Sequence, residues 1–272
     1  LYSRSLFNSP FDSVREYLNN LKGINGFIYN NYTEKGTAGQ RFIRKYFTVE
    51  NGKKIDAIRT KIEEWKKKKL INENEYFVLL ASLIESVPFY ANISGVYAAF
   101  LKKYDPRALK SLEIKPFSFY SGTKSHSVYN KNSMELINKL NVDVLYLDPP
   151  YNQRQYAPNY HLLETIALYD NPKIKGVTGM RDYKNQKSEF CNKDTALETL
   201  EKIAKTAKYK YLILSYNSEG IMPEKDILSV LGKYGKVNLK NIDYLRFKSN
   251  SNGDSKHKKT IQEQLYVLKS VG

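Results

Sequence analysis

The residues best suited to chemistry are Asp148, Pro149, Pro150 and Tyr151, which directly follow the apolar stretch Val144–Leu147. Two prolines cannot continue the hydrogen-bond ladder of a sheet, so the predicted strand ends at Asp148. In open α/β sheets, ligands bind outside the carboxyl ends of the strands. The tetrapeptide therefore stands where a ligand is expected.

These four residues suit the alkylation of a weakly nucleophilic amine. The lone pair of an exocyclic base amine is conjugated with the ring, and two hydrogen-bond acceptors help the nitrogen to pyramidalise. The Asp148 carboxylate and the Pro149 carbonyl are the candidate acceptors, and Tyr151 is a candidate stacking platform. A strand-terminating turn with a solvated aspartate explains the same tetrapeptide equally well, because a four-residue match is weak alone.

The longer stretch Asp143–Tyr156, together with Asn159–Ile166 behind it, resembles the catalytic motif of the N6-adenine DNA methyltransferases. The resemblance is to the Dam-like (D12) class and covers the chain from about Tyr46 to its end. It implies methyl transfer from S-adenosylmethionine to N6 of a flipped adenine in double-stranded DNA. It also implies site-specific DNA methylation in a restriction-modification system, with a cognate restriction endonuclease as a possible partner.

Composition is compatible with a polyanionic partner. The chain has 272 residues, a formal net charge of +16 and a pI near 9.5, and phosphate contacts would supply salt-dependent affinity. A lysine-rich proteome explains the charge as well. The single cysteine, Cys191, and three scattered histidines predict no metal site. No signal peptide or membrane-spanning run is recognised, so we expect a cytoplasmic protein without membrane contact.

The predicted fold is α/β, a Rossmann-like methyltransferase sheet with an inserted helical DNA-recognition module. We expect a remnant of the core in residues 1–39, the helical module in 40–115 and the catalytic core in 116–272. Helices are predicted after Asp12, over Ile55–Trp65, from a capping box at Asn72 to Val87, and over Val96–Leu101. A basic face on the second helix, which includes Arg59, is either a DNA contact or a solvated surface.

The catalytic core is expected to alternate strands and helices. The predicted strands are 127–130, 144–147, 211–214, 237–247 and 264–268, and the predicted helices are 134–140, 161–169, 196–205 and 225–234. Tyr216 and Asn217 follow a strand and are secondary pocket candidates. His161 is interpreted as a structural residue of a first helical turn, because methyl transfer from a sulfonium needs no strong base.

Cofactor binding is assigned to Asp148 and Asn132. The resembled family often has an acidic residue near the position of Asn132, and helix capping explains an asparagine there equally well. The family's N-terminal Phe-x-Gly-x-Gly-like motif is not found in this chain. Together with the start at Leu1, this predicts that part of the core is missing and that the strand Val144–Leu147 has an open edge.

DNA contacts are predicted in three segments. The first segment directly follows the motif and contains Arg154, Gln155 and Tyr156. The second is a long loop, 171–194, which we interpret as mobile and which carries Arg181 and Lys184. The third is a hairpin tip that carries Lys256 and Lys258. An RNA or protein methyltransferase with a related pocket is an alternative, and a DNA-binding fragment without catalysis is another. The sequence specifies neither the recognised bases nor the oligomeric state.

Overall fold

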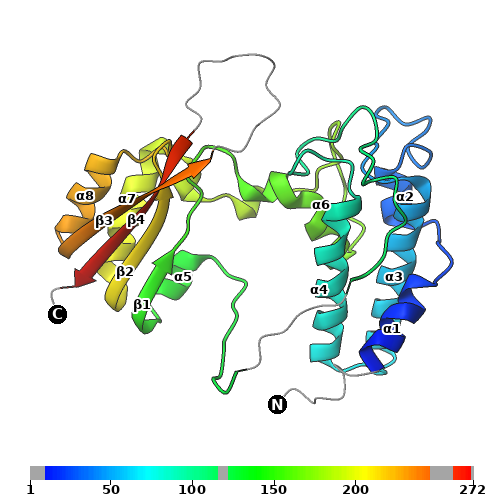
Figure 1. Ribbon diagram of the computed structural model, residues 1–272, viewed down its shortest axis with the longest axis horizontal. Coiled ribbons are helices and arrows are strands. Elements are labelled where there is room, and N and C mark those ends of the chain that lie inside the picture. Colours follow the sequence, from blue (N-terminus) through cyan, green and yellow to red (C-terminus); the bar gives the residue numbers. More distant parts are fainter. Residues whose placement is uncertain (1–9, 116–121, 246–259, 271–272) are drawn as a thin grey trace. The chain divides into compact units, whose positions relative to one another are not determined.

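A computed structural model describes residues 10–115, 122–245 and 260–270 of the chain, which form two compact units (Figure 1). The first unit comprises residues 1–123 and 157–184, and the second comprises 124–156 and 185–272. The tetrapeptide Asp148–Tyr151 therefore lies in the second unit. Lys256 and Lys258, which the sequence assigns to DNA binding, lie outside the described residues.

The first unit is helical. Its helices are α1 (Pro10–Asn19), α2 (Phe27–Tyr32), α3 (Val49–Lys67), α4 (Glu73–Tyr90) and α6 (Tyr156–Leu168), whose first residue belongs to the second unit. The capping box predicted at the start of α4 is present, because Asn72 and Glu75 bond to each other's backbone N–H. Apolar side chains from these helices form one core.

The predicted helix over Val96–Leu101 is wrong, since the structure has no helix there. The backbone of this segment instead bonds to distant residues. The Tyr97 N–H donates to the Asn159 carbonyl at 2.7 Å, and the Leu101 N–H donates to the Asn92 carbonyl at 3.0 Å. These tertiary bonds replace the local bonds that a helix would need.

Asp56 organises the start of α2 from within α3. Its buried carboxylate accepts the backbone N–H groups of Gly26, Ile28 and Tyr29 at 2.8–3.1 Å and the Tyr169 hydroxyl at 2.7 Å. Burial raises the pKa of this carboxyl, and the four hydrogen bonds oppose the shift. A carboxylate satisfies the orphan donors of a helix N-terminus particularly well.

The predicted basic face of α3 needs correction at Arg59, which is buried. Its guanidinium donates to the Ile166 and Ala167 carbonyls at the end of α6, each at 3.0 Å, a favourable position for a cation. On the remaining face, Glu64 pairs with both Lys61 and Lys68. These contacts favour the solvated-surface alternative over a DNA contact for this part of the helix.

The second unit is a four-stranded mixed sheet with helices on one face, which confirms the α/β class. Its elements are α5 (Ser133–Ile137), β1 (Asn141–Leu147), α7 (Lys193–Thr206), β2 (Lys208–Asn217), α8 (Glu224–Gly232), β3 (Gly235–Leu245) and β4 (Thr260–Ser270), with short 3-10 helices η2 (Lys184–Gln186), whose first residue belongs to the first unit, and η3 (Glu189–Cys191). The strand order is β1-β2-β4-β3, with β1 parallel to β2 and the other pairs antiparallel. Among the described residues, β1 thus lies at one edge.

Alternate residues of the strands face two different environments. Leu212, Leu214 and Leu268 point into a core shared with α5, α7 and α8. On β1, Val144 and Tyr146 are 50% and 57% exposed. The strand predicted over 127–130 is wrong: this segment has no regular secondary structure, and Val128 is 94% exposed. With so little to bury, the segment has no packing reason to join the sheet.

His161 is a buried residue of α6. The predicted first-turn position is wrong, because the helix begins five residues earlier, at Tyr156. Its Nε2 lies 3.0 Å from the Tyr97 carbonyl oxygen, so Nε2 carries the proton, and Nδ1 has no partner among the described residues. Burial lowers the pKa of this imidazole to about 4.

Replacing Asp56 with Ala leaves three backbone N–H groups without their acceptor, and we expect a loss of about 3 kcal/mol or more in the free energy of unfolding. Urea unfolding followed by fluorescence of Trp65, the single tryptophan, reports on this unit. Asp12→Ala, which removes an exposed pair with Arg15, is the matched control and should cost below about 1 kcal/mol. Equal effects of the two substitutions would refute the capping role.

Protonation of His161 should destabilise the first unit in acid. The folded-state pKa of about 4 lies below the ordinary value of 6.5, so the unfolded chain binds the proton first. The stabilisation is complete above pH 6.5 and is lost as pH falls towards 4, by up to about 3 kcal/mol. His161→Phe should flatten this pH dependence of unfolding, whereas His126→Phe, at an exposed histidine, should leave it unchanged.

Candidate active site

The chain leaves the sheet where the sequence predicts. Strand β1 ends at Leu147, opposite Leu214 of β2, and Asp148, Pro149 and Pro150 follow outside the ladder. The Asp148 side chain is exposed and has no hydrogen-bond or ion-pair partner within the described part of the chain; the Pro149 carbonyl oxygen likewise accepts no hydrogen bond there. Both predicted acceptors are therefore available to a ligand.

The backbone of Tyr151 is fixed from behind. Its carbonyl oxygen accepts the Ile221 N–H at 2.9 Å and the Tyr216 hydroxyl at 3.4 Å, while that hydroxyl accepts the Met222 N–H at 3.2 Å. The Tyr151 ring, by contrast, is 41% exposed. A ring that is free on a fixed backbone fits the predicted stacking role.

Tyr216 is therefore a support and not a pocket wall. Its side chain is 2% exposed, and a Cβ atom at Gly220 would lie 2.2 Å from its ring. Only glycine allows this approach, which places the Tyr216 hydroxyl beneath the motif. Asn217, the other secondary candidate, bonds to Glu263 through its amide at 3.0 Å.

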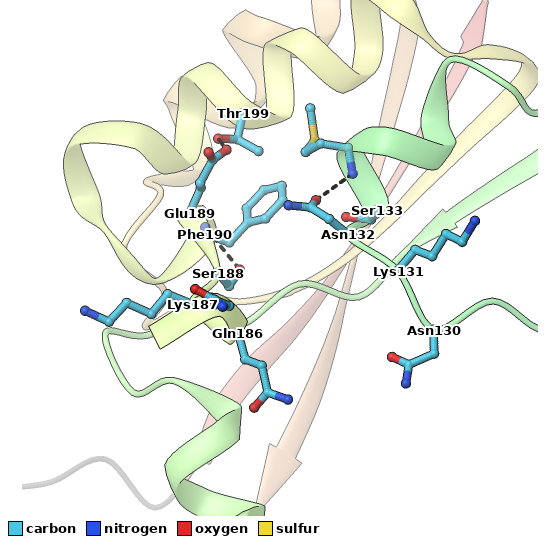
Figure 2. A pocket seen from close by; sticks show the side chains of 12 residues that line it. Asn130, Lys131, Asn132, Ser133, Gln186, Lys187, Ser188, Glu189, Phe190 and Thr199 are labelled. Carbon is cyan, nitrogen blue, oxygen red and sulfur yellow. Dashed lines mark hydrogen bonds between the residues drawn. The ribbon is translucent and has the colours of Figure 1, made fainter. Parts of the chain in front are cut away.

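Two neighbouring pockets lie beside the motif. The first, which we name the strand-end pocket, has a volume of about 410 Å³ and is lined by Asp148, Pro149, Pro150 and Tyr156, with Ile137 and Phe190 as apolar wall. The second, the adjoining pocket, has about 470 Å³ and is lined by Asn132 and Lys131 among others (Figure 2). Both share four residues, Ser133, Gln186, Ser188 and Phe190.

A short segment, residues 185–191, forms the common wall and is named the strap. Gln155 holds it through two hydrogen bonds: the Gln155 amide donates to the Ser188 carbonyl at 3.2 Å, and the Ser188 N–H donates to the Gln155 side-chain oxygen at 2.7 Å. The Cys191 thiol also lies 3.5 Å from the Arg154 carbonyl oxygen. The residues directly after the motif thus fix the wall of both pockets.

Asn132 caps α5, the alternative that the sequence left open. Its side-chain oxygen accepts the Met134 N–H at 3.0 Å, the bond drawn in Figure 2. The amide nitrogen takes no part in this cap and belongs to a residue lining the adjoining pocket. A cofactor contact through that nitrogen stays a prediction.

The other residues predicted to bind DNA are divided between the two units. Arg154 and Tyr156 are exposed next to the motif, and Tyr156 also lines the strand-end pocket. Arg181 lies in the first unit and donates two hydrogen bonds to Asp170, at 2.7 and 3.1 Å. Lys184 is exposed. Their DNA-binding roles stay predictions.

Sequence reasoning missed the strap residues Gln186, Ser188 and Phe190 as pocket walls. They are far from the motif in sequence, and only tertiary hydrogen bonds bring them to it. The one available signal was Phe190, an aromatic residue within a polar loop that turns out to be buried.

Neither a metal centre nor a membrane span is found in the parts of the chain that the structure covers. Within residues 10–115, 122–245 and 260–270, the acidic, histidine and cysteine side chains form no group of three or more that is suited to a metal ion. The described helices include none that combines the length and the apolar character needed to cross a bilayer.

Comparison with known proteins gives consistent matches. The family model described as D12 class N6 adenine-specific DNA methyltransferase matches residues 5–230. The type II methyltransferase M.NlaIII of Neisseria lactamica is 42% identical over 247 residues, covering 90% of this chain and 72% of that protein. The modification methylase StsI of Streptococcus sanguinis is 38% identical, covering 96% of this chain and 40% of that protein.

A further relative, the type II methyltransferase M.FokI of Planomicrobium okeanokoites, is 44% identical over 235 residues. The match covers 84% of this chain and 35% of that protein. The chain thus spans less than half the length of two of the three relatives. No solved structure gave a significant match.

Gln155→Ala should release the strap from the motif segment. We expect faster amide hydrogen exchange over residues 185–191, because the Ser188 N–H loses its acceptor. Gln153→Ala, at an exposed glutamine two residues earlier, is the matched control. Unchanged exchange in the Gln155 variant would show that the strap is held by other contacts.

Proposed function

Because this chain belongs to the D12 class of N6 adenine-specific DNA methyltransferases, we propose that it transfers a methyl group from S-adenosylmethionine to N6 of a flipped adenine in double-stranded DNA. The single observation that carries this proposal is the pair of free acceptors at the end of β1. The Asp148 carboxylate and the Pro149 carbonyl stand over the strand-end pocket without partners among the described residues.

In the proposed mechanism, these acceptors make the amine of the target base nucleophilic. Asp148 and Pro149 each accept one N–H of the amine, so that its lone pair turns out of conjugation. As positive charge develops on nitrogen, the carboxylate stabilises it. Tyr151 stacks on the base, which reaches the pocket only when it is flipped out of the duplex. The alkylated amine is acidic and loses its proton without a strong base.

The pocket walls suit a nucleoside with a charged tail. Phe190 and Ile137 offer apolar surface to a ring, and Ser133 and the Asn132 amide offer hydrogen-bonding groups. When bound, S-adenosylmethionine supplies an electrophilic methyl group on a sulfonium. The free carboxylate of Asp148 attracts that positive charge. We therefore assign the strand-end pocket and the adjoining pocket to the cofactor and the target base together.

DNA binding is assigned to both units. In the second unit, Arg154 and Tyr156 are exposed beside the site. In the first unit, the helical residues 40–115 are proposed to be the target-recognition module. The relatives are named as type II methyltransferases or modification methylases, and we extend this to propose that the chain acts beside a restriction endonuclease for the same site.

Asp148→Ala should reduce methyl transfer to background while the protein stays folded, because the side chain is exposed and has no structural partner in the described chain. The measurement is transfer of tritium-labelled methyl groups to mixed-sequence duplex DNA, with a thermal melt of each variant. Asp143→Ala is the matched control, since Asp143 is an exposed aspartate of β1, the strand that precedes Asp148, and pairs with Lys210. Retained turnover in the Asp148 variant would refute this assignment.

The alternative functions are separated on the same samples. Structured RNA added as competitor should not reduce transfer to duplex DNA; if RNA accepts the label instead, the substrate is wrong. Calorimetric titration of S-adenosylmethionine should show binding by the unmodified chain. Salt-dependent DNA binding without cofactor binding would identify a DNA-binding protein that lacks catalysis.

A further inference from the structure

Two loops of the first unit, far apart in sequence, are fastened into one surface. One is residues 34–43, after α2, and the other is residues 175–180, after α6 (Figure 1). We name them the paired loops. The buried Arg44 links them: its guanidinium donates to the Val177 and Gly176 carbonyls, each at 2.9 Å, and to the Asn31 carbonyl at 3.2 Å.

A second buried side chain reinforces this link. The Tyr32 hydroxyl donates to the Gly179 carbonyl at 2.7 Å, and a Cβ atom at Gly179 would lie 2.9 Å from both Arg44 Nε and the Tyr32 ring. Gly179 also has a φ of +66°, a conformation that glycine adopts without strain. The loop predicted to be mobile is therefore anchored here by specific bonds.

The first of the paired loops is also fixed internally. The Thr37 hydroxyl donates to the Thr33 carbonyl at 2.7 Å and accepts the Arg44 N–H at 2.9 Å. The Thr33 hydroxyl accepts the Gly36 N–H at 3.1 Å. Ordering loops in advance lowers the entropy cost of binding.

The side chains that these fixed loops present are basic and apolar. Ile43 and Val177 are 51% and 53% exposed. Arg41 and Lys175 are exposed, and neither forms an ion pair with a carboxylate among the described residues. Nearby carboxylates are already paired, Glu34 with Lys45 and Asp170 with Arg181. The exposed charge of the surface is therefore positive.

We propose that the paired loops are a DNA-reading surface of the first unit, with Arg41 directed to base edges and Lys175 to phosphate. This inference rests on the proposed function. Arginine is the side chain that most often reads guanine in the major groove, and apolar side chains such as Ile43 and Val177 match the methyl group of thymine. Lysine contacts to phosphate add affinity without sequence preference. Arg44 acts as the positioning residue beneath them.

The test is methylation of a mixed-sequence duplex library by the full chain and its variants, followed by sequencing of the bases around each methylated adenine. Arg41→Ala should lower kcat/KM on preferred sites and relax preference at a flanking position about tenfold or more. Lys175→Ala should raise the KM for DNA on all sites and reduce the salt dependence of binding by about one ion. Lys22→Ala, at an exposed lysine of the same unit that lies outside residues 40–115 and outside the paired loops, is the charge-matched control.

The possible outcomes separate this inference from the proposed function. Thermal melts should stay unchanged, because Arg41 and Lys175 are exposed. Active variants that behave like Lys22→Ala would overturn the inference and leave the proposed function standing. If the unmodified chain transfers no methyl group, the proposed function fails. DNA binding measured by fluorescence anisotropy then decides the inference: weaker binding of both loop variants than of Lys22→Ala supports it, and equal binding overturns it.

Discussion

The candidate site depends on the abrupt end of strand β1. Leu147 is the last residue paired with β2, and the two prolines that follow have no N–H with which to continue the ladder. Asp148 is therefore held at the rim of the sheet by the strand before it and the prolines after it. Everything else at the site, from the fixed Tyr151 carbonyl to the strap held by Gln155, stabilises the chain immediately after that end.

Single polar side chains fix loops and helix ends in the first unit. Asp56 collects the first N–H groups of α2, Arg59 collects the last carbonyls of α6, and Arg44 gathers carbonyls from the paired loops. Each of these side chains is buried, and each satisfies backbone groups that would otherwise be costly to bury. Such bonds hold irregular segments in defined positions, which a binding surface requires.

Local patterns predicted much of this structure. The strand before Asp148, the capping box at Asn72 and the helices and strands after Tyr156 follow from periodicity and turn chemistry, which act over a few residues. The pattern predicts Arg59 on the basic face of its helix, as a DNA contact or part of a solvated surface, because a charged residue is expected opposite the apolar stripe. Its burial depends on carbonyls more than 100 residues away, and no local pattern contains that information.

At the candidate site, too, local patterns predicted some features, and others depend on distant residues. Asp148, Pro149 and Tyr151 could be found because the motif is contiguous. The strap that forms the wall of both pockets could not, since its position depends on the bonds between Gln155 and Ser188. The strand predicted over 127–130 is the opposite case. Its residues have the pattern of a strand, but the described structure offers them no partner strand. Propensity alone does not create a strand.

In the proposed reaction, the free acceptors at the end of β1 direct a methyl group to an adenine amine. The most direct test is nucleoside analysis of duplex DNA after incubation with the chain and labelled S-adenosylmethionine. We expect the label in N6-methyladenine and in no other nucleoside. Label in a cytosine, in added RNA or on protein would contradict it, as would a reaction in which no nucleoside is labelled.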